Sequence, residues 1–168
     1  VGSEMCIRDR NPCGFGWGAV LKEAVLRAQK GDPVSAFGGI FALNRSVDRE
    51  AALALAESGF LEVVIAPDFS DEAVRILREK PSWGKTVRLL KFPLAQPDRM
   101  ELRFLGWGSL LFQQTDSVRN RIEVREARVV TKREPTEEEM RLLERAWGIV
   151  RHVKSNAIVI VSEDGLVG

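Results

Sequence analysis

The polar groups in this sequence that best suit a small polar substrate are Glu62 and the run Lys154–Asn156. Glu62 interrupts the apolar run 61–66, where a carboxylate is rare unless it is paired or functional. It therefore lies either at the edge of a sheet or in a site. The run Lys154–Asn156 could form a turn through local hydrogen bonds, or it could present a cation and a carboxamide to a ligand. Spacing alone leaves both choices open.

Two glycine-containing segments could let a ligand approach the backbone. Gly38 and Gly39 directly follow Phe37 at the start of an apolar run. Glycine in a strand permits close approach of a ligand, but it more often marks a bulge or tight packing. The run 14–18 alternates glycine with aromatic residues, but it lacks the dinucleotide fingerprint and no apolar strand precedes it. We therefore expect no phosphate loop there.

The ligand types in the chain argue against zinc. Pro12-Cys13 matches half of the Pro-Cys-x-x-Cys motif of zinc deaminases, but residue 16 is glycine and no His-x-Glu precedes the motif. One histidine and two cysteines are too few for the ligand set of a structural zinc. His152 lies at the predicted end of a helix, where a cation interacts favourably with the helix dipole, so we expect a structural role for it.

Composition excludes several classes of function. The 168 residues carry 25 Lys and Arg against 24 Asp and Glu, which gives a net charge of +1, and 45% of them are hydrophobic. Such a balance predicts no nucleic-acid partner, and the mixed-charge stretch 119–133 is expected to be a solvated face. No apolar run approaches the roughly 20 residues of a membrane-spanning helix. Two cysteines cannot build a disulfide scaffold, which favours a cytoplasmic protein.

The elements that must position these residues alternate between strands and helices. Hydrophobic periodicity predicts helices at 15–29, 48–58, 70–80 and 136–150, with Gly59 at the end of the second. It predicts strands at 36–43, 61–66, 87–91, 101–105, 109–112, 128–131 and 157–161. The alternation predicts a layered α/β domain with helices packed on a central sheet.

The predicted helix 136–150 has the clearest signals. Thr136 and Glu139 form a capping box, and two more glutamates lie in the first turn. The apolar residues at helical spacing are Met140, Leu143, Trp147 and Val150. We expect these four side chains to line one helical face.

Both ends of the chain differ from its middle. Residues 1–10 show no apolar period and no turn that leads into the next segment, so we expect a non-native leader, with 11–168 as the folded part. Ser162–Gly165 is predicted to be a turn, and the chain stops shortly after a second strand begins. These features predict a fragment of a longer protein.

Several segments occur in an order that is shared with one family. They are Asn11-Pro12-Cys13-Gly14, Asp32-Pro33-Val34-Ser35-Ala36-Phe37-Gly38-Gly39-Ile40, Phe60-Leu61-Glu62-Val63-Val64-Ile65-Ala66-Pro67, Gln113 with Asp116, and Val153-Lys154-Ser155-Asn156-Ala157-Ile158. In this order they resemble the AICAR transformylase domain of the bifunctional purine biosynthesis proteins. The resemblance covers about 11–168.

The resemblance implies a layered α/β/α, cytidine-deaminase-like fold without zinc, of which this truncated chain holds one subdomain and the start of a second. It implies transfer of a formyl group from the co-substrate 10-formyltetrahydrofolate to AICAR (5-aminoimidazole-4-carboxamide ribonucleotide) in the de novo synthesis of IMP. The parent would also be an IMP cyclohydrolase, and it would work as a homodimer with its sites at the interface.

The same resemblance assigns roles to single residues. The family supplies its base and its cation as Lys-His in a Lys-His-x-Asn-Pro motif, and these positions are Arg8 and Asp9 here. Arg8 cannot give up a proton near neutrality and Asp9 is a weak base, so no catalytic residue is assigned and the chain as written is predicted to be inactive. The predicted substrate-binding residues are Gly38, Glu62 and Asn156, and the predicted folate contact is Phe37.

Two other functions are weighed against this one. A genuine short protein could keep the fold as a catalytically inactive nucleotide-binding or oligomerisation module. A zinc-free enzyme of the same fold could act on another nucleotide, although no residue favours that choice.

Overall fold

The computed structural model describes residues 2–8, 11–93, 100–114 and 124–168. Its contacts divide the chain into two compact units. The first unit combines Val1–Leu94 with His152–Gly168, and the second is Ala95–Arg151. All of the predicted substrate-binding and folate-contact residues belong to the first unit.

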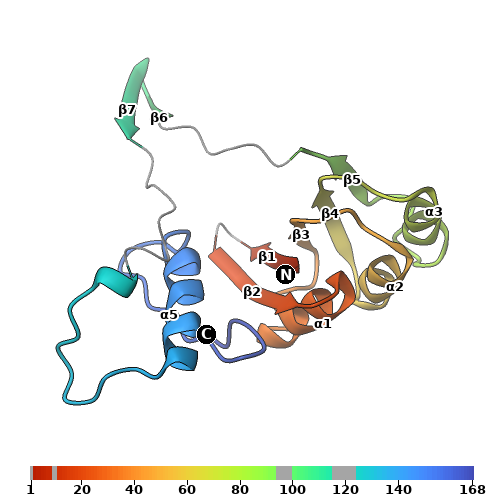
Figure 1. The fold of residues 1–168 in the computed structure, drawn as a ribbon. Helices are drawn as coiled ribbons and strands as arrows, with labels where there is room; N and C mark the ends of the chain where they lie inside the picture. Colours follow the sequence, from red (N-terminus) through yellow and green to blue (C-terminus); the bar gives the residue numbers. More distant parts are fainter. Residues whose placement is uncertain (1, 9–10, 94–99, 115–123) are drawn as a thin grey trace. The chain divides into compact units, whose positions relative to one another are not determined.

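The first unit is built on a five-stranded mixed sheet (Figure 1). Its strands, in spatial order, are β2 (Asn11–Gly18), β1 (Gly2–Arg8), β3 (Gly39–Leu43), β4 (Leu61–Ala66) and β5 (Arg88–Lys91). The strand β1 is antiparallel to both of its neighbours, whereas β3, β4 and β5 run parallel. The ten residues that were expected to be a leader therefore include a strand of this sheet.

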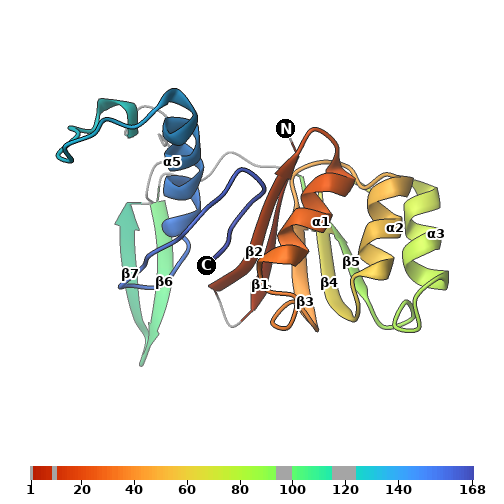
Figure 2. The same ribbon diagram turned by 90° about the horizontal axis from the view of Figure 1, so that it is seen from below.

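Three helices cover one face of the sheet (Figure 2). They are α1 (Leu21–Gly31), α2 (Arg49–Glu57) and α3 (Asp71–Glu79). The core lies between the two layers, and the largest side chains that are fully buried in it include Phe41, Leu55, Leu61 and Leu77. The α/β class that alternation predicted is confirmed.

Side-chain caps fix where the second and third helices begin. The carboxylate of Asp48 accepts a hydrogen bond from the backbone N–H of Ala51 at 2.8 Å, and the hydroxyl of Ser70 accepts one from Ala73 at 3.1 Å. Such caps satisfy backbone N–H groups that have no partner within the helix. Both helices therefore start where the sequence predicted.

The first predicted helix, 15–29, is wrong at its start. Residues 11–18 form β2, and α1 begins at Leu21. A methyl group on Gly14 would overlap the carbonyl oxygen of Ala28, and one on Gly16 would overlap that of Ala24. The glycine-rich run is therefore a strand on which α1 packs closely. This explains the glycine at every second position without a phosphate, although a strand, β1, does precede it.

Two other strand predictions need smaller corrections. The strand β3 begins at Gly39 rather than at residue 36, because the segment before it turns around Asp32. The carboxylate of Asp32 accepts hydrogen bonds from the backbone N–H groups of Val34 and Ser35 at 3.1 and 2.9 Å. The strand at 61–66 has the predicted bounds, but Glu62 is exposed.

The predicted buried strand at 157–161 is wrong. Among the described residues of this segment, Ile158 is 83% exposed and Val161 makes only an isolated bridge, with Leu166. The predicted turn that comes after it is confirmed, since the N–H of Ser162 donates to the carbonyl of Gly165 at 2.9 Å. Leu166 then donates to the carbonyl of Phe15 at 2.8 Å, so the end of the chain lies along β2.

The second unit contains a hairpin of β6 (Met100–Gly106) and β7 (Ser109–Gln114). One face of the hairpin is apolar, and its exposed side chains are Met100, Leu102, Phe104, Leu110 and Phe112. The opposite face carries an ion pair of 2.7 Å between Arg103 and Glu101. The opposite face also carries Leu111, which is 39% exposed, so both faces present apolar side chains and the first face is the more apolar.

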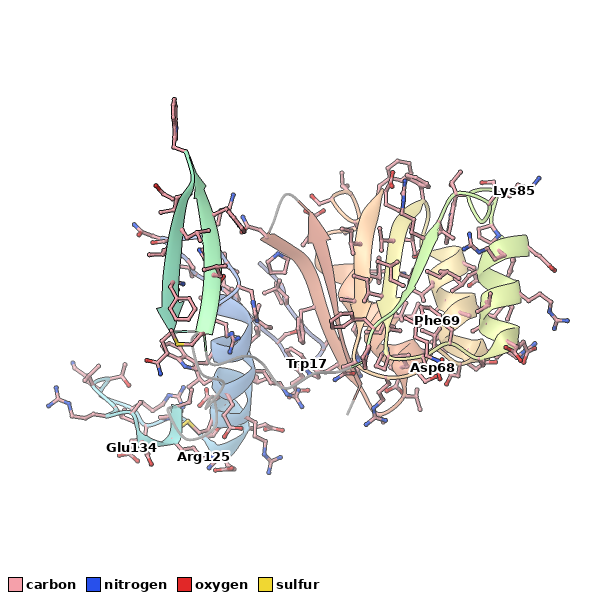
Figure 3. All side chains as sticks on the ribbon, turned by 90° about the horizontal axis from the view of Figure 1, so that it is seen from above. Trp17, Asp68, Phe69, Lys85, Arg125 and Glu134 are labelled. Carbon is pink, nitrogen blue, oxygen red and sulfur yellow. The ribbon has the colours of Figure 1, made fainter. Side chains whose placement is uncertain are left out.

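The longest described helix of the second unit, α5 (Glu137–Val150), has the predicted capping box. On its predicted apolar face Trp147 is 50% exposed, whereas Glu144 is only 7% exposed. Arg125, which precedes the helix (Figure 3), lies 2.6 Å from carboxylate oxygens of both Glu144 and Glu137. The described residues 128–131 form no strand, contrary to prediction.

Candidate functional site

The corner before β3 holds two of the predicted site residues. Gly38 has a φ of 72°, in the left-handed region that favours glycine, and its N–H donates to the carbonyl of Phe60 at 2.8 Å. Phe37 is 63% exposed. The N–H of Gly39 donates to the carbonyl of Ala36 at 3.0 Å, which closes the turn. The corner therefore presents an aromatic ring beside a glycine.

Glu62 lies on β4, which is flanked by β3 and β5 and is not an edge strand. Its carboxylate oxygen Oε2 lies 2.7 Å from Nη1 of Arg88 on β5. Both side chains are exposed. The sheet-edge alternative for Glu62 is therefore wrong, and the carboxylate is available at the surface with a cation beside it.

The strand β1 carries the first of the two positions that the resemblance assigns to a catalytic pair. Arg8 is the last residue of β1 and pairs with Asn11 at the start of β2, and Ile7 pairs with Ile40 on β3. Because β1 and β3 are antiparallel, the backbone of Arg8 lies level with the first residue of β3. Asp9 lies outside the described residues.

The segment after α5 contacts the start of β2, next to the end of β1. The backbone N–H of Lys154 donates to Oδ1 of Asn11 at 3.3 Å. The hydroxyl of Ser155 donates to Oδ1 of Asn156 at 2.9 Å. This local bond is typical of a turn, and Asn156 is exposed, so the segment forms a turn that presents a carboxamide to solvent.

Strand direction brings these parts together at one edge of the sheet, which here means the edge formed by the ends of the strands and not an edge strand. The parallel strands β3 and β4 begin there, next to Gly38 and Glu62, and the antiparallel strand β1 ends there at Arg8. The contact between Asn11 and Lys154 adds the segment that carries Asn156. The predicted site residues that the structure describes thus belong to one edge, although the chain separates them widely.

Sequence reasoning missed three residues of this edge. Phe60, Arg88 and Asn11 contact the predicted residues, but each contact joins segments that are distant in the chain. The only sequence signal for Asn11 is its place in a motif. No spacing rule pairs Arg88 with Glu62, because the pair depends on the register of β4 and β5.

The described part of the chain shows neither a metal centre nor a membrane span. It holds no group of three or more His, Cys, Asp or Glu side chains that could bind a metal ion. None of its helices is both long and apolar enough to cross a bilayer. His152 directly follows Arg151, the C-cap of α5, as predicted from the helix end.

These features define an α/β domain with a polar, glycine-containing edge of its sheet as the candidate binding site. The chain belongs to the AICARFT/IMPCHase bienzyme family, whose model matches residues 3–168.

Relatives in that family include proteins named bifunctional purine biosynthesis protein PurH. The one from Halalkalibacterium halodurans is 46% identical over 165 residues, which is 98% of this chain and 31% of the relative. The one from Aquifex aeolicus is 46% identical over 162 residues, 96% of this chain and 30% of the relative. This chain therefore spans about a third of the length of these relatives.

The family match includes most of β1. The expectation that residues 1–10 are a non-native leader stays a prediction, as does the assignment of 11–168 to a partial transformylase domain. Resequencing of the template across the first ten codons tests the first of these predictions.

Proposed function

We propose that this chain is part of an AICAR formyltransferase, whose parent protein is also an IMP cyclohydrolase. The observation that carries the proposal is the gathering of Gly38, Glu62 and the Lys154–Asn156 turn at one edge of the sheet. The relatives are named as bifunctional purine biosynthesis proteins, which favours this function over that of an inactive module.

Each residue of this edge has a chemical task in the proposal. The carboxylate of Glu62 accepts hydrogen bonds from substrate N–H or O–H groups, and the carboxamide of Asn156 can both donate and accept. Gly38 lets the planar substrate approach the backbone because no side chain stands in the way. The exposed ring of Phe37 offers a stacking surface for the aromatic part of the folate.

The reaction requires two further groups. The 5-amine of AICAR attacks the formyl carbon, so that a C–N bond forms to AICAR and the bond from the formyl carbon to N10 of the folate breaks. A base must take the amine proton, which ends on the folate nitrogen, and a cation must stabilise charge on the formyl oxygen. Arg8 can supply charge but cannot accept a proton, and Asp9 is too weak a base near neutrality. We therefore propose that this chain binds substrate but does not turn it over.

The remaining parts of the proposal concern the parent protein. We propose that it uses 10-formyltetrahydrofolate as co-substrate without zinc, and that it forms a homodimer in the cytoplasm. Neither a nucleic acid nor a membrane is a proposed partner.

Titration of the chain with AICAR tests the proposal. Calorimetry should show saturable binding, and Glu62→Gln should weaken it by about 10-fold or more, because hydrogen bonds to a charged group contribute about 1.5–3 kcal/mol. The matched control is Arg88→Met, which removes the cation of the pair but leaves the carboxylate. Absence of saturation at millimolar AICAR would reject the proposal, and turnover in a formyl-transfer assay would reject the predicted inactivity.

A further inference from the structure

The aromatic rings of Phe60 and Phe37 contact each other at the corner before β3. Their ring centroids lie 5.7 Å apart with an interplanar angle of 54°, which is a favourable tilted geometry for two aromatic rings. Each ring also faces the glycine next to the other. A methyl group on Gly38 would lie 3.6 Å from the Phe60 ring, and one on Gly59 would lie 4.0 Å from the Phe37 ring.

The backbone strengthens this contact. The carbonyl of Phe60 accepts the N–H of Gly38 at 2.8 Å, so Phe60 holds both the ring and the backbone of the corner. Gly59 has a φ of 88°, which turns the chain from α2 into β4 just before Phe60.

Phe60 is itself firmly placed. It directly precedes Leu61, which is fully buried and pairs with Gly39 on the neighbouring strand. Two residues further along the chain is Glu62. Phe60 thus connects the aromatic corner to β4, which carries Glu62, the carboxylate that is proposed to bind the substrate.

We propose that Phe60 is a positioning residue that orients the ring of Phe37 for stacking on the folate co-substrate. This inference rests on the proposed function, since it names how one part of that site is held. Phe60 itself is half-buried and acts through Phe37. Loss of its ring would remove this contact from the exposed ring of Phe37 and make that ring less ordered, so that part of the binding free energy would go into ordering it.

The test compares Phe60→Leu with Phe69→Leu in the full 168-residue chain. Phe69 is a suitable control because it is also half-buried and packs against the core, but it lies beyond the other end of β4 (Figure 3). Phe60→Leu should weaken the binding of tetrahydrofolate by roughly 3- to 10-fold, the range expected from loss of an aromatic pair. AICAR affinity should change by less than about twofold. Phe60→Tyr, which keeps the ring, should restore the affinity for tetrahydrofolate.

A second measurement is independent of any ligand. The 19F NMR signal of 4-fluorophenylalanine at position 37 should shift and narrow in Phe60→Leu, because the ring gains freedom, but not in Phe69→Leu. If the signal does not respond, the inference is wrong whatever the titrations show. If it responds but the unsubstituted 168-residue chain binds neither tetrahydrofolate nor AICAR, the ring contact stands and the proposed function fails. Equal loss of tetrahydrofolate affinity in both leucine variants would also overturn the inference, since the effect would then be one of general stability.

Discussion

Oδ1 of Asn11 accepts a hydrogen bond from the backbone N–H of Lys154 at 3.3 Å, across 143 positions of the chain. The contact joins the start of β2 to the turn that carries Asn156. It is one of the contacts that hold the segment after α5 on β2, and it lies at the edge of the sheet where Gly38 and Glu62 lie. The proposed binding by Asn156 should therefore respond to substitution of Asn11.

Removal of this tie should loosen the turn. In Asn11→Ala the amide of Lys154 should exchange with solvent about 2- to 10-fold faster, since one hydrogen bond contributes about 0.5–1.5 kcal/mol net. Hydrogen exchange followed by NMR measures this directly. Asn11→Asp keeps an acceptor oxygen at the same place and serves as the control. An unchanged exchange rate in Asn11→Ala would show that the turn is held by other contacts.

Close packing of α1 on β2 should make Gly14 intolerant of any side chain. Gly14→Ala places a methyl group against the carbonyl oxygen of Ala28, and a backbone atom cannot move aside without shifting the helix. We expect a loss of about 3 kcal/mol or more in the free energy of unfolding, measured by urea denaturation. A methyl group on Gly168 meets no atom within 4 Å, so Gly168→Ala should change stability by less than about 0.5 kcal/mol. Similar midpoints for the two variants would contradict the packing described for β2.

The capping box of α5 should make this helix sensitive to acid. The guanidinium of Arg133, together with the backbone N–H of Thr136, lowers the pKa of Glu139 from 4.5 to about 2. A lowered folded-state pKa contributes stability that is fully present above the unfolded value and is lost as the pH falls through the folded value. Helix stability followed by circular dichroism should therefore decline between about pH 4.5 and pH 2.

Two variants separate the charge of this cap from its hydrogen bonds. Glu139→Gln can still complete a capping box but does not titrate, so its decline over the same pH range should be smaller. Thr136→Ala removes the N-cap and should cost about 1 kcal/mol at pH 7. An identical pH profile for Glu139→Gln and the unsubstituted chain would assign the acid sensitivity to other carboxylates.

The exposed apolar face of the β6–β7 hairpin should bind hydrophobic dyes. Phe104 is 80% exposed and lies on the same face as Phe112, so Phe104→Lys combined with Phe112→Lys should reduce the fluorescence of bound ANS to roughly half. The control Arg103→Lys changes a charged residue on the opposite face, keeps its charge and should leave the dye signal unchanged. An equal signal in all three proteins would place the dye site elsewhere.

Local chemistry made several elements predictable. Ser70 and Thr136 cap helices by bonds that span three residues, and β4 is a short apolar run, so both kinds of signal are contained in a few neighbouring positions. The α/β class followed from the order of such elements. The motifs also directed attention to Gly38, Glu62 and Asn156.

Other features depended on what lies across the fold. The prediction of a helix over part of β2 failed because it did not include the packing of α1. The glycines of β2 let α1 lie close to this strand, and that contact joins two elements of the fold. The burial of Glu144 on α5 could not be predicted from the apolar pattern of the helix, because it accompanies an ion pair with Arg125, which lies outside the helix. The type of Ile158 predicts burial, but its position relative to the sheet leaves it exposed.

By itself, the sequence determined the class of fold, the caps, most strand positions and the residue types available for binding, because these depend on hydrogen bonds and periodicity within a short stretch of chain. The tertiary structure decided which of those residues share one edge of the sheet. That edge depends on strand direction, on the register between β1 and β3, and on single contacts such as those of Asn11 with Lys154 and Phe60 with Gly38. Such contacts join distant segments, and their partners are chosen only when the chain has folded.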